Sequence, residues 1–188
     1  MVLHLYYSLL FFIKLLLYRL FGHLRSLRFS WKNHCGKNVQ MEFDKGASVS
    51  LGRNIGLRNA VYLSVRKGAN LVIGNKVFIN NGCNIVVHQT VLIGENTKFG
   101  QNVMVFDHDY DYKTEGGVSA KVYKNSDVII GSNCWIGAGC IILRGTRIGD
   151  NSVVGAGCVL KGDYPPNSII IQKRNTIVVK KRSAKEDA

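Results

Sequence analysis

Two histidines are the side chains of this chain best suited to acid–base chemistry at neutral pH. His88 and His108 are twenty residues apart, and His108 stands between Asp107 and Asp109. An imidazole with an ordinary pKa of about 6.5 is a natural general base, and a neighbouring carboxylate can fix its tautomer. The pattern marks this corner, with His88, His108 and Asp107, as a candidate site for general-base chemistry. Two other interpretations stay open: a polar turn with exposed histidines, or a metal site with two His and one Asp ligand.

A six-residue repeat determines where these histidines lie. Between residues 130 and 160 an aliphatic residue recurs every six positions, Gly follows four of these aliphatics, and a small residue stands four places after most of them. This period fits neither an amphipathic helix nor a lone strand, and it is typical of a β-solenoid whose triangular turn takes three hexads. We expect the aliphatic to point inward, the Gly to permit the corner, and the small residue to fill the interior. The aliphatic positions are Ile130, Ile136, Ile142, Ile148, Val154 and Leu160.

The same register extends towards the N-terminus, with coils that begin at Leu51, Ile73, Ile93, Ile130 and Ile148. The first two spacings, 22 and 20, slightly exceed eighteen and predict widened corners. The third spacing, 37, predicts a loop that leaves the solenoid at residues 111–127. Because coils stack about 4.8 Å apart, residues at one coil position form a column. His88 and His108 share a position on successive coils, so we expect them on adjacent rungs beside the loop.

We therefore predict an all-β solenoid with an N-terminal amphipathic α-helix. The expected parts are an apolar and basic helix (residues 1–29), a linker (30–44), a β-helix (45–167) that carries the loop 111–127, and C-terminal strands with a basic tail (168–188). The first segment lacks the roughly 20 apolar residues that span a bilayer, and it has no signal-peptide pattern. Lys14 and Arg19 interrupt it, which favours a helix lying on a membrane surface. A helix that caps the open end of the solenoid is the alternative.

The amino-acid composition limits the kinds of partner that this chain is expected to bind. The formal charge of +13 suits nucleic acid, acidic lipid headgroups or phosphorylated substrates. The basic residues crowd residues 19–37 and 173–185 and no nucleic-acid motif is present, so an anionic surface is favoured over nucleic acid. Four of the five cysteines occupy the small inward position, which indicates core packing and a reducing, cytoplasmic compartment rather than metal or redox chemistry. These are Cys83, Cys134, Cys140 and Cys158.

Several motifs together resemble the hexapeptide-repeat acyltransferases. They are the hexads, the Asp-His-Asp corner at 107–109, the long excursion, the run IGSNCWIG at 130–137, GDNS at 149–152, GAG at 155–157 and PPNS at 165–168. The resemblance covers about residues 45–170. Within this family the motifs resemble most the maltose, galactoside and serine O-acetyltransferase branch, especially members that modify bacterial polysaccharides. It implies a left-handed parallel β-helix, a homotrimer with active sites between subunits, and acetyl-CoA as donor without a metal.

The resemblance also implies residue roles. His108 would remove a proton from the acceptor hydroxyl, which then attacks the acetyl-CoA thioester directly while backbone amides hold the oxyanion. Tyr110 stands where many relatives carry a second His, and the segment 171–175 replaces their usual Gly-x-Pro-Ala motif. Residues implied for coenzyme A are Trp135, Gly137, Ala138, Ala156 and Lys161, with Lys173 and Arg174 at its phosphates. Residues implied on the acceptor side are Asn81, Asn84, His88, Asp109 and Tyr110.

The expected function is an acetyl-CoA-dependent O-acetyltransferase that acts on a sugar hydroxyl of a bacterial surface polysaccharide or its lipid-linked precursor. We expect the enzyme at the inner face of the plasma membrane, held there through residues 1–29. Three alternatives remain: an N-acetyltransferase of an amino sugar nucleotide, a metal enzyme similar to γ-carbonic anhydrase, and a scaffold without catalysis.

Overall fold

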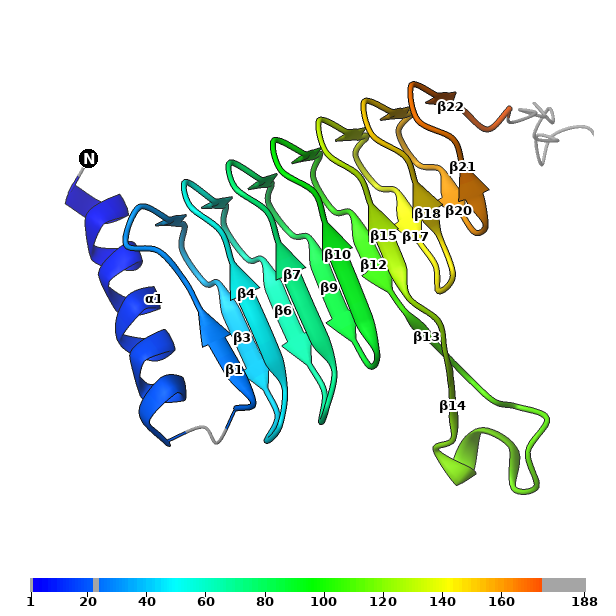
Figure 1. Cartoon of the computed structure of the whole chain (residues 1–188), viewed down its shortest axis with the longest axis horizontal. Helices are drawn as coiled ribbons and strands as arrows, with labels where there is room; N and C mark the ends of the chain where they lie inside the picture. The colour runs from blue at the N-terminus through cyan, green and yellow to red at the C-terminus, as the bar shows by residue number, and fades with distance from the viewer. Residues whose placement is uncertain (1, 22–23, 174–188) are drawn as a thin grey trace, which may run out of the picture.

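The computed structural model describes residues 2–21 and 24–173, which form one helix and a parallel β-solenoid (Figure 1). Helix α1 (Val2–Phe21) precedes three parallel sheets that form the faces of the solenoid. Sheet A contains β1 (Ser26–Arg28), β4 (Ser48–Leu51), β7 (Asn70–Ile73), β10 (Thr90–Ile93), β15 (Val128–Ile130), β18 (Arg147–Ile148) and β21 (Asp163–Tyr164). Sheet B contains β2 (His34–Cys35), β5 (Gly56–Leu57), β8 (Phe78–Ile79), β11 (Lys98–Phe99), β16 (Trp135–Ile136), β19 (Val153–Val154) and β22 (Ile169–Ile170).

Sheet C contains β3 (Gln40–Phe43), β6 (Tyr62–Val65), β9 (Asn84–Val87), β12 (Met104–Phe106), β17 (Ile141–Ile142) and β20 (Val159–Leu160). A separate antiparallel pair, β13 (His108–Tyr110) and β14 (Tyr123–Asn125), leaves the solenoid with the short 3₁₀ helix η1 (Gly117–Ala120) near its tip. The predicted solenoid with one N-terminal helix is confirmed.

The hexad pattern produces the core as expected. Ile73, Ile93, Ile130 and Ile148 stack in one column along sheet A, and each is at most 2% exposed. The five cysteines, all within the described residues, are buried and form no disulfide, and burial raises the pKa of the Cys35 thiol to about 12. These thiols therefore pack as small apolar side chains.

The glycines of the repeat have a different structural role from the one that the sequence predicted. A Cβ on Gly137 would lie 2.6 Å from the backbone nitrogen of Ala156 on the next coil, closer than real Cβ atoms approach. The left-handed corner residue between sheets A and B is instead an Asn, such as Asn133 or Asn151, with φ of 56° and 58°. The prediction that these glycines turn the corner was therefore wrong: they allow adjacent coils to approach.

The solenoid begins earlier than the sequence predicted. Strands β1, β2 and β3 form a first coil within residues 26–43, where a helix end and a linker were expected, and β3 pairs in parallel with β6. This segment lacks the aliphatic-Gly signature, but β3 alternates exposed and buried residues, with Met41 and Phe43 inward. At the other end, β22 continues sheet B, and the further strand expected at residues 176–179 lies outside the described residues.

Helix α1 covers the open end of this first coil. Phe11, Phe12 and Leu15 are buried against it, and the Ser8 hydroxyl accepts the Cys35 N–H at 3.1 Å. The Tyr18 hydroxyl donates to the Met41 carbonyl at 3.0 Å. The helix therefore supplies both apolar contact and hydrogen bonds to an edge that would otherwise be exposed, as the capping interpretation predicted.

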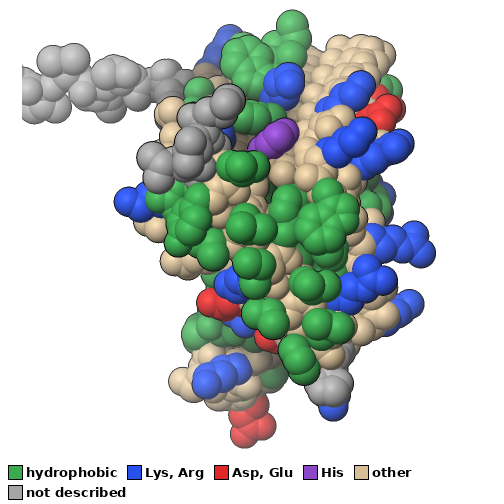
Figure 2. Space-filling view, turned by 90° about the vertical axis from the view of Figure 1, so that its left-hand side faces the viewer, with side chains coloured by type: hydrophobic (Ala, Val, Ile, Leu, Met, Phe, Trp, Pro, Cys, Tyr) green, Lys and Arg blue, Asp and Glu red, His purple; other side chains and the backbone are tan. Residues whose placement is uncertain are grey.

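The outer face of α1 stays exposed and apolar. Figure 2 shows hydrophobic side chains gathered on this end of the molecule, with Lys and Arg along its rim. No helix among the described residues is long and apolar enough to cross a membrane. The exposed apolar residues of the helix are Leu5, Tyr6, Leu9, Leu10, Ile13, Leu16, Leu17, Leu20 and Phe21.

Candidate active site

The histidines lie at a corner between sheets C and A that is shorter than the corners beneath it. Val65 pairs with Val87 and Asn70 pairs with Thr90, so the second coil has four corner residues, 66–69, while the third has two, 88–89. On the fourth coil the chain leaves the solenoid at this corner and forms the β13–β14 hairpin. The excursion thus starts at His108, slightly before the predicted 111–127.

The two imidazoles stack face to face as the column prediction required. Their ring centroids are 3.6 Å apart and the rings are 12° from parallel. The side chain of His108 keeps 17% of its surface exposed. The His108 ring is thus held on one face and remains partly open to solvent.

Asp107 fixes this corner from inside. It is fully buried, its Oδ1 accepts the His88 N–H at 2.8 Å, and its Oδ2 accepts the Gln89 N–H at 2.7 Å. Its Oδ1 also lies 3.3 Å from Nδ1 of His108. Because an ionised carboxylate only accepts hydrogen bonds, it favours the tautomer with hydrogen on Nδ1. The Nε2 lone pair of His108 then remains available to take a proton.

His88 is held in its neutral form. Burial lowers its pKa below the ordinary value, and the positive charges of His108 and Arg66 lower it further. Asp107 and Asp44 act in the opposite direction without reversing the shift. The neutral form of His88 therefore stacks on the His108 ring without charge repulsion.

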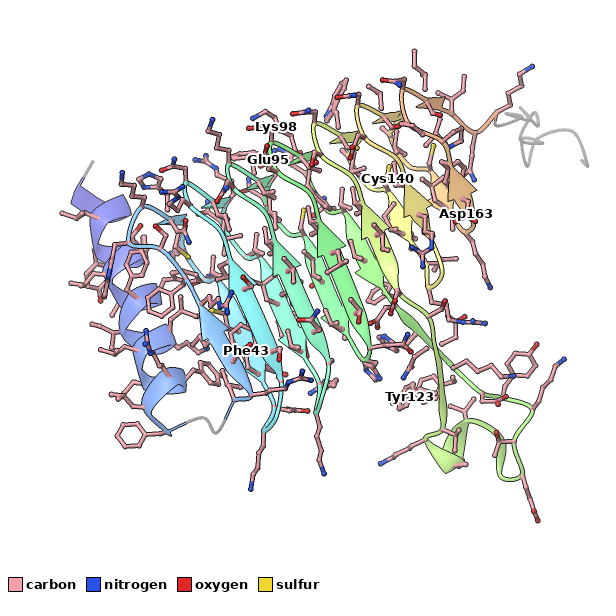
Figure 3. The ribbon with its side chains drawn as sticks, in the orientation of Figure 1. Phe43, Glu95, Lys98, Tyr123, Cys140 and Asp163 are labelled. Atoms are coloured by element: carbon pink, nitrogen blue, oxygen red, sulfur yellow. The ribbon has the colours of Figure 1, made fainter. Side chains whose placement is uncertain are left out.

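The hairpin encloses the histidine pair from the side. The Tyr123 ring meets His88 edge-on at 4.6 Å between centroids and lies 5.7 Å from His108, at the base of the hairpin (Figure 3). Tyr110 packs on Tyr123 at 4.7 Å. These aromatic contacts hold the two imidazoles against the solenoid and leave the exposed Tyr110 ring next to them.

Polar contacts tie the hairpin to the coils. Asp109 forms an ion pair with Arg144, and the Gln89 amide donates to Asp127 at 2.7 Å. Arg144 and Gln89 were not predicted from the sequence as site residues, and Tyr123 was assigned no role there. Arg144 could have been predicted from the register. Met104 pairs with Ile141, so Arg144 shares a column with Asp107. Tyr123 carried no such signal, because it lies outside the repeat.

Comparison with known proteins places this arrangement in a family. Residues 127–162 match the model described as bacterial transferase hexapeptide, six repeats. The matched segment is the part of the solenoid formed by β15 to β20, where the six-residue register is most regular. Residues 127–162 of this chain are therefore identified as hexapeptide repeats. The resemblance inferred from the motifs is confirmed, and the solenoid is the left-handed parallel β-helix of such repeats.

Three known proteins illustrate the likeness. The galactoside O-acetyltransferase of Escherichia coli strain K12 is 35% identical over 64% of this chain and 58% of its own length. WbbJ of the same strain, described as a lipopolysaccharide biosynthesis O-acetyl transferase, is 28% identical over 65% of this chain and 67% of its own. A crystal structure of AntD, a Bacillus cereus N-acyltransferase in complex with coenzyme A and an amino sugar nucleotide, superposes with a TM-score of 0.66.

The extent of these matches is partial. AntD is 19% identical and covers 87% of this chain and 88% of its own, so it supports the fold alone. This hexapeptide-repeat protein spans little more than half the length of the galactoside relative.

The residues expected at coenzyme A form two groups. Trp135 is 58% exposed on sheet B, and Ala138 and Ala156 follow at the corner between sheets B and C, where Gly157 N–H donates to the Ala138 carbonyl at 2.7 Å. Gly137 is buried beneath them. Lys161 instead follows β20, at the corner of sheets C and A that also carries the histidines. Lys173 is exposed, and Arg174 lies outside the described residues.

The expected acceptor residues divide in the same way. Asp109 and Tyr110 lie on β13 beside His108. Asn84 is the first residue of β9, whereas His88 follows the last residue of that strand. About 13 Å of strand therefore separates Asn84 from His88. Asn81 accepts the Asn59 N–H at 3.0 Å and belongs to a corner ladder. One chain therefore does not bring Asn81, Asn84 or the Trp135 edge to His108.

Metal ligation was the remaining interpretation of the corner. Within residues 2–21 and 24–173, no three or more His, Cys, Asp or Glu side chains are grouped to hold a metal ion. The Asp107 carboxylate beside the partly exposed His108 ring is an arrangement suited to taking a proton from a hydroxyl.

Proposed function

We propose that this protein is an acetyl-CoA-dependent O-acetyltransferase that acts on a sugar hydroxyl of a bacterial surface polysaccharide or its lipid-linked precursor. The observation that carries the proposal is the partly exposed His108 ring, whose Nδ1 lies 3.3 Å from the buried Asp107 carboxylate. The repeat shared with transferases and the O-acetyltransferase names of the two E. coli relatives support the reaction class.

The proposed reaction is a direct transfer. Nε2 of His108 takes the proton of the acceptor hydroxyl as its oxygen attacks the thioester carbonyl of acetyl-CoA. The C–S bond then breaks, the acetyl group stays on the sugar oxygen, and the coenzyme A thiolate takes the proton from His108. The Asp107 carboxylate stabilises the imidazolium that exists between these steps.

We further propose that the active form is a homotrimer. The outer side of sheet C is largely apolar at Met104, Ile141 and Val159, with Phe106 and Leu143 beside them, and Val159 is 44% exposed. A second copy on this side would cover apolar surface and add an acceptor or coenzyme edge to the His108 corner. Light scattering of the purified protein should give the mass of three chains, and a monomer would contradict the proposal.

Activity is tested with the full chain, acetyl-CoA and a panel of sugars. We expect release of free coenzyme A together with an ester-linked acetyl group on a sugar hydroxyl, identified by NMR and by its loss in mild base. The panel includes maltose, a galactoside and an amino sugar nucleotide. An amide-linked acetyl group on the amino sugar, or no transfer to any sugar, would contradict the proposed O-acetylation.

We also propose that the outer face of α1 lies on the inner surface of the plasma membrane. The first 41 residues contain no Asp or Glu but include six Lys and Arg residues, and Figure 2 shows Lys and Arg side chains beside the apolar face. An amphipathic helix with this composition binds the headgroup region of anionic membranes. The basic residues are Lys14, Arg19, Arg25, Arg28, Lys32 and Lys37.

The helix position determines how the membrane proposal should be tested. Deletion of residues 1–29 would expose the core that Phe12 and Leu15 cover, so substitutions on the outer face are better. Leu9→Gln with Leu16→Gln should weaken binding to phosphatidylglycerol vesicles at least about tenfold, because each buried Leu contributes about 1.5–3 kcal/mol. Val118→Gln, at an exposed hairpin residue, is the control. Co-sedimentation that is unchanged by the double variant would exclude membrane contact through this face.

A further inference from the structure

Three exposed cations follow the corner that leads from α1 to the histidines. Lys45 and Lys67 occupy the same position on the first and second coils, because Phe43 pairs with Val65. Arg25 lies beneath them, where its N–H donates to the Ala47 carbonyl at 2.9 Å. We call Arg25, Lys45 and Lys67 the basic edge. Among the described residues, none of the three is in an ion pair.

The corner geometry makes the two lysines project. Each is followed by a glycine with left-handed backbone, Gly46 at φ 82° and Gly68 at φ 75°, which turns the chain at the tip of a four-residue corner. The next corner, residues 88–89, is two residues shorter. The corner between β9 and β10 is thus set back beyond the corner that carries Lys67, and the β13–β14 hairpin leaves the solenoid on its other side (Figure 1).

Nearby acidic groups do not neutralise the edge. Arg66 lies 3.9 Å from both Glu42 and Asp44, so these carboxylates are already engaged. The basic edge and Arg66 together carry four positive charges. The two neighbouring carboxylates, Glu42 and Asp44, offset two of them and leave an excess of two positive charges. Arg66, beside Lys67 on the same corner, shares its column with His88 and lowers the pKa of that ring, so this corner lies next to the histidine corner.

We propose that the basic edge binds the diphosphate of a lipid-linked sugar acceptor and so orients its sugar towards His108. The inference rests on the proposed function and specifies its substrate: the acceptor is tethered to the membrane through a diphosphate. The edge starts at the helix that faces the membrane, and His108 is three coil spacings beyond Lys45, about 14 Å along the solenoid. The diphosphate at the lysines thus lies between the lipid and the reacting hydroxyl.

The test measures binding without any acetyl donor, so its result does not depend on whether transfer occurs. Full-length protein is co-sedimented with phosphatidylcholine vesicles that contain either a polyprenyl diphosphate or phosphatidylglycerol at equal surface charge. We expect tighter binding to the polyprenyl diphosphate vesicles. Lys45→Ala with Lys67→Ala should raise that Kd about thirtyfold, because each basic residue near an anionic surface contributes about fivefold.

The matched control is Lys76→Ala with Lys98→Ala, two exposed lysines on other parts of the coils, which should preserve the preference for the diphosphate. An equal loss of binding to both vesicle types by the basic-edge variant would overturn the proposal, because it would indicate general attraction to anionic membranes. Binding of soluble UDP that the basic-edge variant abolishes, without any preference for polyprenyl diphosphate vesicles, would overturn the lipid source in favour of a nucleotide-linked acceptor.

Discussion

His108→Ala should lower the rate of acetyl transfer by about 10²- to 10⁴-fold, the usual contribution of a positioned general base. The acceptor hydroxyl is a poor nucleophile until its proton is removed, and Nε2 of His108 is the open nitrogen at the corner. The measurement is the initial rate of coenzyme A release at saturating acetyl-CoA. We expect little change in the free energy of unfolding, because the ring is partly exposed and its aromatic contacts are with His88, Phe106 and Tyr123.

The control for this change is His34→Ala. His34 is also an exposed histidine on the solenoid, but it lies on sheet B, away from the corner. It should transfer acetyl at the parent rate. An undiminished rate for His108→Ala would remove the base assignment and leave the fold untouched. A rate loss accompanied by unfolding at lower denaturant concentration would instead indicate a structural role for the ring.

Asp107→Ala should lower the free energy of unfolding by about 2–5 kcal/mol and lower the transfer rate as well. The substitution leaves the His88 and Gln89 N–H groups without their acceptor, and each unsatisfied buried donor costs about 1–3 kcal/mol. It also removes the carboxylate beside Nδ1 of His108, so the ring can rotate or change tautomer. Urea denaturation and the transfer assay measure the two effects separately.

Asp127→Ala is the matched control for Asp107. Asp127 accepts a single side-chain hydrogen bond from Gln89 and is only partly buried, so we expect a loss below about 1 kcal/mol. If Asp107→Ala were as stable as the parent protein, the carboxylate would not be holding the corner. Asp107→Asn should resemble Asp107→Ala, because its amide offers one acceptor oxygen where two N–H groups need acceptors.

The repeat made much of the site predictable. A period of eighteen or slightly more residues places His88 beneath His108, and the long interval before Ile130 indicates the excursion beside them. The inward cysteines followed from the same count. Such features depend on neighbours along one solenoid axis, where the register alone decides which residues stack.

The contacts that hold the histidines in place depend on the tertiary structure and could not be predicted from the register. Asp107 is adjacent to His108 in sequence, but its two bonds to the His88–Gln89 corner arise only because that corner is two residues shorter than the one below it. Arg144 reaches Asp109 through the hairpin fold, and Tyr123 reaches the imidazoles from the far strand of that hairpin. Turn length and side-chain direction determine these contacts, and neither is written in a six-residue period.

The N-terminal segment shows the same division. Its sequence identified an apolar helix with basic residues but left membrane contact and capping as alternatives. Packing against the first coil separates the two faces, because Phe11, Phe12 and Leu15 fill the open end while Leu9 and Leu16 stay outside. The sequence by itself determined the solenoid and the pairing of its histidines. The folded chain decided which groups hold those histidines in place and which side of the helix remains available, because both depend on surfaces that exist only once the coils are stacked.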